Sequence, residues 1–224
     1  MGSRTESEKA DMAKIIGIIQ VKGGVGRSTV ATNLAGELAK KGRTVLIDCD
    51  MPQGTSASWY SLRREIGRAD DLEADTARDH RELIQKVERH AKGADFIVLD
   101  GPPRIAEMTR AILMLADVCL IPVGASVAEV WATTDVLTII DEAKKAKKKV
   151  KAYIVWTRHR AYTSLARDLT EQVEKELGLT ALETTLGLRV AYPTALGNGR
   201  TVAELGDPVA REEIRAFVAN VVRL

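Results

Sequence analysis

A glycine-rich segment near the N-terminus constrains the fold of this chain more than any other feature. Residues 22–29 read Lys-Gly-Gly-Val-Gly-Arg-Ser-Thr and follow an apolar run at 15–19. A buried strand that runs into such a turn and then into a helix is an arrangement that binds phosphate, because backbone N–H groups surround the anion and the helix N-terminus carries partial positive charge. The sequence therefore predicts a nucleotide-binding protein; an ordinary turn between a strand and a helix is the alternative.

The spacing of this segment differs at two positions from that of an ordinary P-loop, Gly-x-x-x-x-Gly-Lys-Ser/Thr. Val21 stands in place of the first glycine and Arg27 in place of the lysine. Apart from Arg27, the residues fit a deviant pattern, Lys-Gly-Gly-x-x-Lys-Ser/Thr, in which Lys22 is an additional lysine. The residues that we predict to bind the nucleotide phosphates are Lys22, Gly23, Gly24, Val25, Gly26, Arg27, Ser28 and Thr29.

Short apolar strands alternate with helices along the rest of the chain. The apolar runs predict strands at 15–20, 45–49, 96–99, 118–123 and 152–156. The segments between and after them predict helices at 29–41, 62–92, 105–115, 127–148, 163–177 and 208–223. Continuous apolar strands separated by helices are typical of a parallel sheet with helices on both faces. We therefore expect an α/β fold with a mostly parallel sheet, the fold of a P-loop nucleoside triphosphatase of the deviant type.

The length and composition indicate one globular domain. The chain has 224 residues, of which 45% are hydrophobic and 29% charged, as is typical of a soluble protein. We expect a leader at 1–12 that is disordered or was added by cloning, and a single domain over 13–224. An apolar signal core and a run of about eighteen apolar residues are both absent from the sequence, so we expect a cytoplasmic protein without membrane insertion. Cys49 and Cys119 lack metal-ligand spacing, which favours buried free thiols.

Aspartates follow two of the expected strands. Asp48 and Asp50 close the second strand, and Asp100 follows the third. Ligands of parallel sheets bind at the carboxyl edge, where these residues would meet the glycine-rich segment. Alone, such an aspartate caps a turn or a helix more often than it binds a ligand. Beside a P-loop, we predict that Ser28, Asp50 and Asp100 form a Mg²⁺ site and that Asp50 lies near the attacking water.

Longer segments resemble a known family. The segment LIDCDMPQGTSASW at 46–59 resembles the Asp-x-Asp-Pro-Gln-Gly switch of ParA proteins, and FIVLDGPP at 96–103 resembles their third-strand motif. The segments at 116–143 and 186–205 are also similar to the small, ParF-like ParA proteins. The chain is therefore identified as a member of the ParA/MinD branch of P-loop ATPases. Over 13–224 it is similar to ParF-like ParA proteins, including McdA-type carboxysome-positioning ATPases.

Several functional expectations follow from this resemblance alone. It implies a homodimer that forms with ATP and Mg²⁺, weak ATPase activity, non-specific DNA binding in the ATP state, and a ParB-like or McdB-like adaptor that stimulates hydrolysis. Lys22 would reach across the dimer to the phosphates of the other subunit, and Asp50 would orient the attacking water. The cargo, positioned on the bacterial nucleoid, would be a plasmid, a chromosome region or a protein assembly such as a carboxysome.

The segment expected to contact the adenine departs from the family pattern. ParA proteins usually place an asparagine near the base at the end of the fifth strand, where this chain has Thr157 and Arg158. A second candidate contact is Pro193, in the Tyr192-Pro193 segment. Thr157, Arg158 and Pro193 are therefore the residues that we predict to bind the nucleoside.

Met51 and Arg27 are two further departures. Met51 separates Asp50 from the following proline, an insertion that would let Asp48 share the role of Asp50. Arg27 replaces a lysine, a compact charge that reaches the β- and γ-phosphates, with a larger, planar, forked cation. The arginine is either natural in this lineage or a substitution that holds ATP without turnover. We expect nucleotide binding to be retained and hydrolysis to be impaired.

Basic residues in the last third of the chain are candidates for DNA binding. The resemblance places the DNA-contacting surface there, and the arginines concerned are Arg189, Arg200, Arg211 and Arg215. Contacts to DNA phosphates would be independent of sequence and sensitive to salt. The lysines at 144–151 are interpreted first as a solvated helix end, because lysines there complement the helix dipole.

The final helix carries an apolar stripe formed by Ile214, Phe217, Val218, Val221 and Val222. Such a stripe occurs in helices that lie on membranes as well as in helices that pack on a core. The modest length and the neighbouring Glu212 and Glu213 favour packing, because carboxylates are repelled by anionic lipid. A MinD-like membrane-associated ATPase that regulates cell division is therefore kept as the alternative function.

Overall fold

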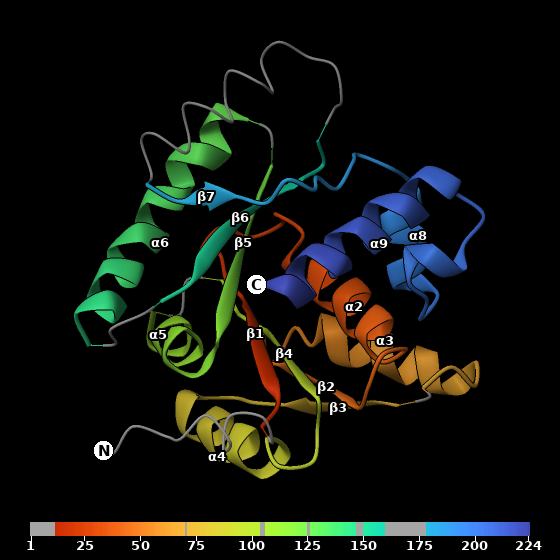
Figure 1. Cartoon of the computed structure of the whole chain (residues 1–224), viewed down its shortest axis with the longest axis horizontal. Coiled ribbons are helices and arrows are strands. Elements are labelled where there is room, and N and C mark those ends of the chain that lie inside the picture. The colour runs from red at the N-terminus through yellow and green to blue at the C-terminus, as the bar shows by residue number, and fades with distance from the viewer. Residues whose placement is uncertain (1–11, 70, 104–105, 125, 147–149, 160–177) are drawn as a thin grey trace.

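A parallel sheet forms the centre of the computed structural model (Figure 1), which describes residues 12–69, 71–103, 106–124, 126–146, 150–159 and 178–224. Within these residues the sheet has seven strands in the order β3-β2-β4-β1-β5-β6-β7, and every neighbouring pair is parallel. The strands are β1 (Lys14–Ile18), β2 (Thr44–Asp48), β3 (Leu72–Thr76), β4 (Phe96–Asp100), β5 (Val118–Gly124), β6 (Ala152–Thr157) and β7 (Thr180–Ala181). The predicted α/β class with a parallel sheet is confirmed.

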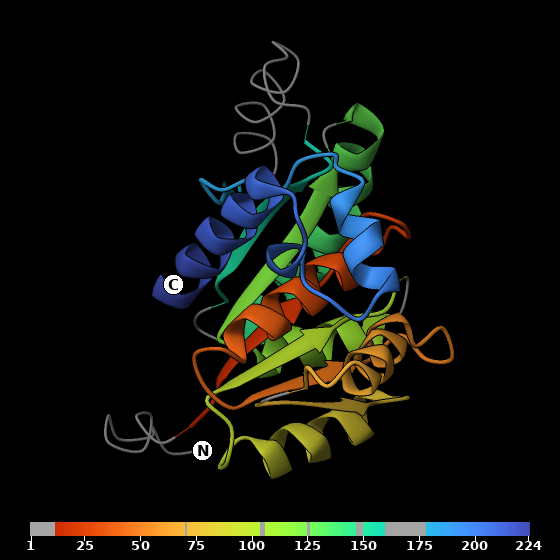
Figure 2. The ribbon, with the colours of Figure 1, turned by 90° about the vertical axis from the view of Figure 1, so that its right-hand side faces the viewer.

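Helices cover both faces of the sheet (Figure 1, Figure 2). One face carries α4 (His80–His90), α5 (Ala106–Leu115) and α6 (Val127–Ala146). The other carries α2 (Arg27–Leu38), α3 (Thr55–Glu65), α8 (Ala191–Gly197) and α9 (Pro208–Arg223), together with the short 3₁₀ helix η1 (Val202–Glu204). Successive strand residues point to opposite faces, so Ile15 belongs to the first apolar cluster and Ile16 to the second. Both faces of the sheet are therefore buried, as its continuous apolar strands predict.

The segment at 62–92, which was predicted to be mostly helical, contains a strand between two helices. Helix α3 ends at Glu65, Gly67 adopts a left-handed φ of 67°, and the chain then forms edge strand β3 before α4. Of the β3 residues only Leu72 is buried, so an edge strand of mostly polar residues lacks the apolar run by which the other strands are recognised. Helix α4 begins where the Asp79 carboxylate accepts hydrogen bonds from two backbone N–H groups.

Three other short elements, β7, α8 and η1, were not predicted from the sequence, and the helix predicted at 163–177 lies outside the described residues. Side-chain contacts hold η1 and the residues before it against α2 and α3. Arg63 of α3 forms a buried ion pair with Glu204, Nη1 to Oε2 at 2.9 Å, and Trp59 Nε1 donates to the Arg200 carbonyl. The two bonds fix the path of the chain after α8.

Helix α9 packs its apolar stripe into the protein. Ile214, Phe217, Val218 and Val221 are buried in the same cluster as residues of α2, whereas Val222 is 36% exposed. This observation agrees with the packing interpretation of the stripe. None of the helices within the described residues is both long and apolar enough to cross a membrane.

Candidate nucleotide site

The glycine-rich segment forms the connection between β1 and α2 at the carboxyl edge of the sheet. Gly24 and Gly26 have φ angles of 76° and 94°, a left-handed backbone that glycine adopts without a steric penalty. Gly26 is the N-cap of α2, and no side chain caps the helix there. The first N–H groups of α2 are therefore left for an anion, as in other phosphate-binding loops.

Arg27 is held under this loop by main-chain oxygens. Its Nη1 donates to the carbonyls of Gln20 and Lys22 at 2.8 and 2.6 Å, and its Nε donates to the Gly101 carbonyl at 2.8 Å. The remaining nitrogen, Nη2, lies 3.7 Å from Asp50 Oδ2. Burial lowers the pKa of the Arg27 guanidinium, an effect that the negative charges of Asp100 and Asp50 oppose. The guanidinium is thus a buried cation that joins the loop to the ends of β1 and β4.

The two aspartates that follow β2 have different surroundings. Asp48 is 1% exposed, and its carboxylate accepts hydrogen bonds from the backbone N–H groups of Asp50 and Ala57, both at 2.9 Å. It therefore caps the first turn of α3 from the strand. Asp50 is more open, with 21% of its side chain exposed. Asp48 thus stabilises the loop that contains Met51, whereas Asp50 approaches Arg27 and keeps part of its side chain exposed.

Asp100 lies beside Asp48 because β2 and β4 pair in parallel register. Its Oδ2 accepts a hydrogen bond from Ser56 Oγ at 2.6 Å, and the Ser28 hydroxyl is near enough to act on the pKa of Asp100, which it lowers. Its Oδ1 is buried without a hydrogen-bond partner in the described part of the chain. Burial, and then the charge of Asp48, raise the pKa of Asp100 to about 7.

These features fit the predicted Mg²⁺ site. A buried carboxylate oxygen that lacks a partner is costly unless a cation or a donor satisfies it. A hydroxyl and a carboxylate are also ligands that Mg²⁺ accepts in nucleotide sites, where phosphate and water oxygens complete its coordination. The described residues contain no group of three or more His, Cys, Asp or Glu side chains that could hold a metal ion by themselves. The arrangement therefore suits a cation that arrives with phosphates.

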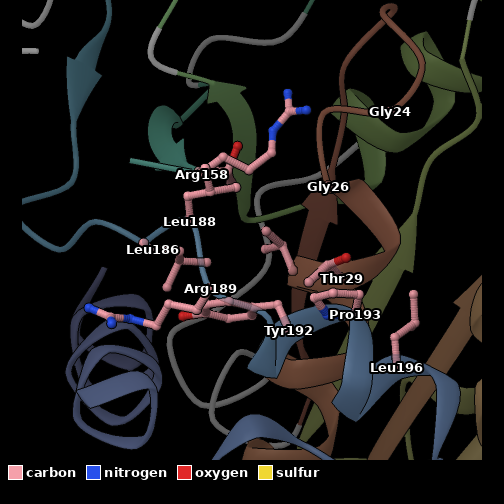
Figure 3. Close-up of a pocket in the computed structure, with 13 residues that line it drawn as sticks. Gly24, Gly26, Thr29, Arg158, Leu186, Leu188, Arg189, Tyr192, Pro193 and Leu196 are labelled. Carbon is pink, nitrogen blue, oxygen red and sulfur yellow. The ribbon is translucent and has the colours of Figure 1, made fainter. Parts of the chain in front are cut away.

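A cavity of about 280 Å³ opens beside the glycine-rich loop (Figure 3). It is lined by Gly24, Gly26, Thr29, Val30, Thr157, Arg158, Leu186, Gly187, Leu188, Arg189, Tyr192, Pro193 and Leu196. Thr157, Arg158 and Pro193, the residues predicted to contact the nucleoside, all line this cavity next to the loop. Thr157 Oγ1 donates to the Val25 carbonyl at 2.9 Å and so ties the end of β6 to the loop.

Sequence reasoning missed the apolar part of this cavity. Leu186 and Leu188 belong to an irregular segment, and Leu196 belongs to the short helix α8. Neither segment shows the periodic apolar pattern by which a helix or a strand is recognised. The family-like segment at 186–205 was the available signal, since the resemblance extends through it.

The four arginines predicted to bind DNA lie in different surroundings. Arg189 lines the cavity and forms an ion pair with Glu213, Nη2 to Oε1 at 2.7 Å. Arg211 Nη2 donates to the Leu205 carbonyl at 2.9 Å. Arg215 is exposed on α9, and Arg200 is half-buried before η1. Of these residues, Arg215 is therefore the most accessible to a surface partner.

The lysine cluster is described only in part, because 147–149 lie outside the described residues. Lys144 and Lys145 are exposed in the last turn of α6, and Lys151 Nζ donates to the Leu224 carbonyl at 2.6 Å. Lys22 is half-buried in the loop, and its carbonyl is one of the three that bind Arg27.

Comparison with known proteins places these features in context. The family described as "ATPase MipZ" matches residues 14–174. The maintenance of carboxysome distribution protein A of Halothiobacillus neapolitanus is 29% identical over 216 residues, 95% of this chain and 98% of that protein. The protein of the same name from Gloeobacter kilaueensis is 30% identical over 207 residues, 89% of this chain and 88% of that protein. A McdA variant from Cyanothece, solved with ATP, superposes with a TM-score of 0.77 at 17% identity, over 95% of this chain and 97% of that one. This last likeness concerns the fold.

The raised pKa of Asp100 predicts how stability depends on pH without Mg²⁺. Between the ordinary pKa of 3.8 and the folded value of about 7, the folded state holds a proton that the unfolded state has lost. The free energy of unfolding should therefore fall as the pH rises through this range. Asp100→Asn should flatten this decline, which urea denaturation at pH 5 and pH 7.5 in a chelator would measure. Asp135→Asn, at an exposed site on α6, is the control. Equal declines for all three proteins would contradict the prediction.

Proposed function

Because the chain belongs to the MipZ family of ATPases, we propose that it binds and hydrolyses ATP at residues 22–29 and works as a ParA-type positioning ATPase. The expected resemblance to ParA-type proteins is confirmed by this family and by the carboxysome distribution relatives. The observation that carries the proposal is the position of the buried Asp100 beside Arg27 at the start of α2, together with an apolar cavity that is lined by Gly24 and Gly26 of the loop and excludes Asp100 from its lining. In this proposal the phosphates bind at the loop and the nucleoside binds in the adjoining cavity.

The two halves of ATP are assigned as follows. The backbone of 23–28 and the N-terminus of α2 bind the phosphates, with Ser28, Asp50 and Asp100 on the side of the metal. Mg²⁺ bound there would neutralise charge on the phosphate oxygens during transfer. The base packs in the cavity against Pro193, between Thr157 and the Leu186–Leu188 wall. Asp50, the more open of the two aspartates after β2, orients the attacking water.

The proposed active form is a homodimer in which Lys22 of each subunit contacts the phosphates of the other. Within the described residues, the Lys22 ammonium is not in an ion pair, so it is available to such an anion. The dimer would bind DNA non-specifically on the nucleoid, and a ParB-like or McdB-like adaptor would stimulate hydrolysis. The relatives named for carboxysome distribution support a protein assembly as the cargo, beside a plasmid or a chromosome region.

Dimerisation should require ATP with Mg²⁺ and should be lost in Lys22→Ala, because the variant lacks the cation that bridges the subunits. Light scattering coupled to size-exclusion chromatography, with ATP and with ADP, would measure the mass. Lys41→Ala, at an exposed lysine beyond α2, should still dimerise. Much of the nucleotide affinity should survive in Lys22→Ala, since the loop backbone is intact. A wild-type monomer in saturating ATP would refute the dimer.

Arg27 should make this chain a slow ATPase that still binds nucleotide. Its guanidinium is anchored by three carbonyls, so it cannot follow charge that develops on the γ-phosphoryl group as a flexible lysine can. A cation misplaced by about an ångström costs on the order of a hundredfold in rate. Arg27→Lys should therefore raise steady-state turnover by about this factor and change ATP affinity only slightly. If the lysine variant hydrolyses ATP no faster, the arginine is a native feature of catalysis.

DNA binding should require ATP, ignore sequence and weaken as salt rises, because it rests on phosphate neutralisation. Replacing the exposed Arg215 and the half-buried Arg200 with Ala should weaken binding to unrelated DNA sequences equally and reduce the salt dependence. Arg64→Ala, at an exposed position of α3, serves as the control. Unchanged binding would move the surface to the lysines at the end of α6. Co-sedimentation with anionic liposomes instead of DNA would favour the MinD-like alternative.

A further inference from the structure

One carboxylate of the last helix holds the wall of the cavity. Glu213 lies on α9, whereas Gly187, Arg189 and Tyr192 line the cavity from the segment before and within α8. All three of these residues donate hydrogen bonds to Glu213. In Figure 3 the Arg189 side chain runs from the cavity wall toward α9 and lies beside Tyr192. Hydrogen bonds to Glu213 of α9, which lies 21 to 26 residues further along the chain, therefore hold this part of the wall.

The geometry of this contact is that of a strong, charge-assisted pair. Arg189 Nη2 and Nε lie 2.7 and 3.0 Å from Glu213 Oε1, and Nε lies 3.0 Å from Oε2. The Tyr192 hydroxyl and the Gly187 N–H donate to Oε2, both at 3.1 Å. Only 18% of the Glu213 side chain is exposed. Bidentate arginine–carboxylate pairs fix orientation as well as adding energy, so Glu213 sets the position of all three donors.

The backbone at Gly187 is shaped for this contact. A Cβ atom at residue 187 would lie 2.9 Å from Glu213 Oε1 and 3.1 Å from Arg189 Nε. A side chain there would push the carboxylate and the guanidinium apart. Because Gly187 has no Cβ, the main chain approaches Glu213 closely without displacing either side chain.

The same contact occupies polar groups of two side chains in the wall, Arg189 and Tyr192. The Tyr192 hydroxyl and the Arg189 guanidinium are both bound to Glu213, and Thr157 is bound to the Val25 carbonyl. What these residues present to the cavity is mostly ring and aliphatic surface, beside Leu186, Leu188 and Pro193. A flat, apolar base would pack against such a wall only while the wall keeps its position.

We propose that Glu213 is a positioning residue for the nucleoside half of the substrate, which it serves by fixing Gly187, Arg189 and Tyr192 in the cavity wall. The proposal rests on the proposed function, since it takes the cavity as the place of the base. It assigns to α9 a part in nucleotide affinity although Glu213 does not itself line the cavity. The phosphate half is held by the loop and by α2, with which Glu213 has no hydrogen bond or ion pair among the described contacts. Loss of Glu213 should therefore weaken only the binding that depends on the nucleoside.

The test compares a ligand that has a nucleoside with one that lacks it. Isothermal titration calorimetry would measure the dissociation constants of ADP and of pyrophosphate, each with Mg²⁺, for the wild type, Glu213→Gln and Glu212→Gln. Glu212 is the neighbouring carboxylate, exposed on α9, and is the matched control. Glu213→Gln keeps the shape and removes the charge that orients Arg189. It should weaken ADP binding about tenfold, the effect of one charge-assisted bond, and leave pyrophosphate binding unchanged.

The possible outcomes separate this inference from the proposed function. Unchanged ADP binding in Glu213→Gln, or equal weakening for ADP and pyrophosphate, overturns the role of Glu213 alone. A wild type that binds ADP no more tightly than pyrophosphate overturns the assignment of the cavity to the base, and one that binds neither ligand overturns the proposed nucleotide site as well. If Glu213→Gln fails to fold, Tyr192→Phe removes one bond to the same oxygen. This variant should weaken ADP binding about threefold and spare pyrophosphate; equal effects on both ligands would overturn the proposal.

Discussion

Parallel pairing of β4 with both β1 and β2 determines where the groups of the candidate site lie. The register brings the carboxyl ends of these strands level, so that Ile18 pairs with Asp100 and Asp100 with Asp48. The glycine-rich loop leaves β1 at the same edge. Because a parallel strand needs a crossover on one face before it can pair again, each of these ends is followed by a loop and a helix. This edge of the sheet therefore brings together the ends of strands that are far apart in the sequence.

Three charged side chains are buried at the carboxyl edge of the sheet. Asp48 and Asp100 are almost fully buried, and Arg27 lies 7% exposed beside them. Burial raises the pKa of both carboxyls, the charge of Asp48 raises the pKa of Asp100 further, and the Arg27 guanidinium opposes the rise at Asp100 only in part. Asp48 is satisfied by backbone donors at the start of α3, whereas one oxygen of Asp100 has no partner among the described residues. The arrangement is thus incomplete in a way that a cation with phosphates would complete.

The two halves of the site depend on different parts of the fold. The proposed phosphate side is formed by α2 and by the ends of β1, β2 and β4, which are neighbours in the sheet. The proposed nucleoside side is formed by the end of β6 and by 186–196, which is held by contacts to α9. Under this proposal, a change in α9 alters the binding of the base and leaves the binding of the phosphates unchanged. Since α9 also carries the exposed Arg215, one helix joins the cavity to a basic surface residue.

Local patterns in the sequence were sufficient for the central strands, the phosphate loop and the aspartates at the strand ends. Each of these features depends on a few consecutive residues. Glycines permit the left-handed backbone of the loop, and an apolar run predicts a buried strand. The edge strand β3, the direction of the Arg27 side chain and the pairing of Arg189 with Glu213 could not be found in this way. β3 lies at the edge of the sheet that the structure describes, and most of its residues are polar. Arg27 and Arg189 form hydrogen bonds with residues that are distant in the sequence. Such contacts depend on which groups the folded chain brings within hydrogen-bonding distance, and only the tertiary structure decides that.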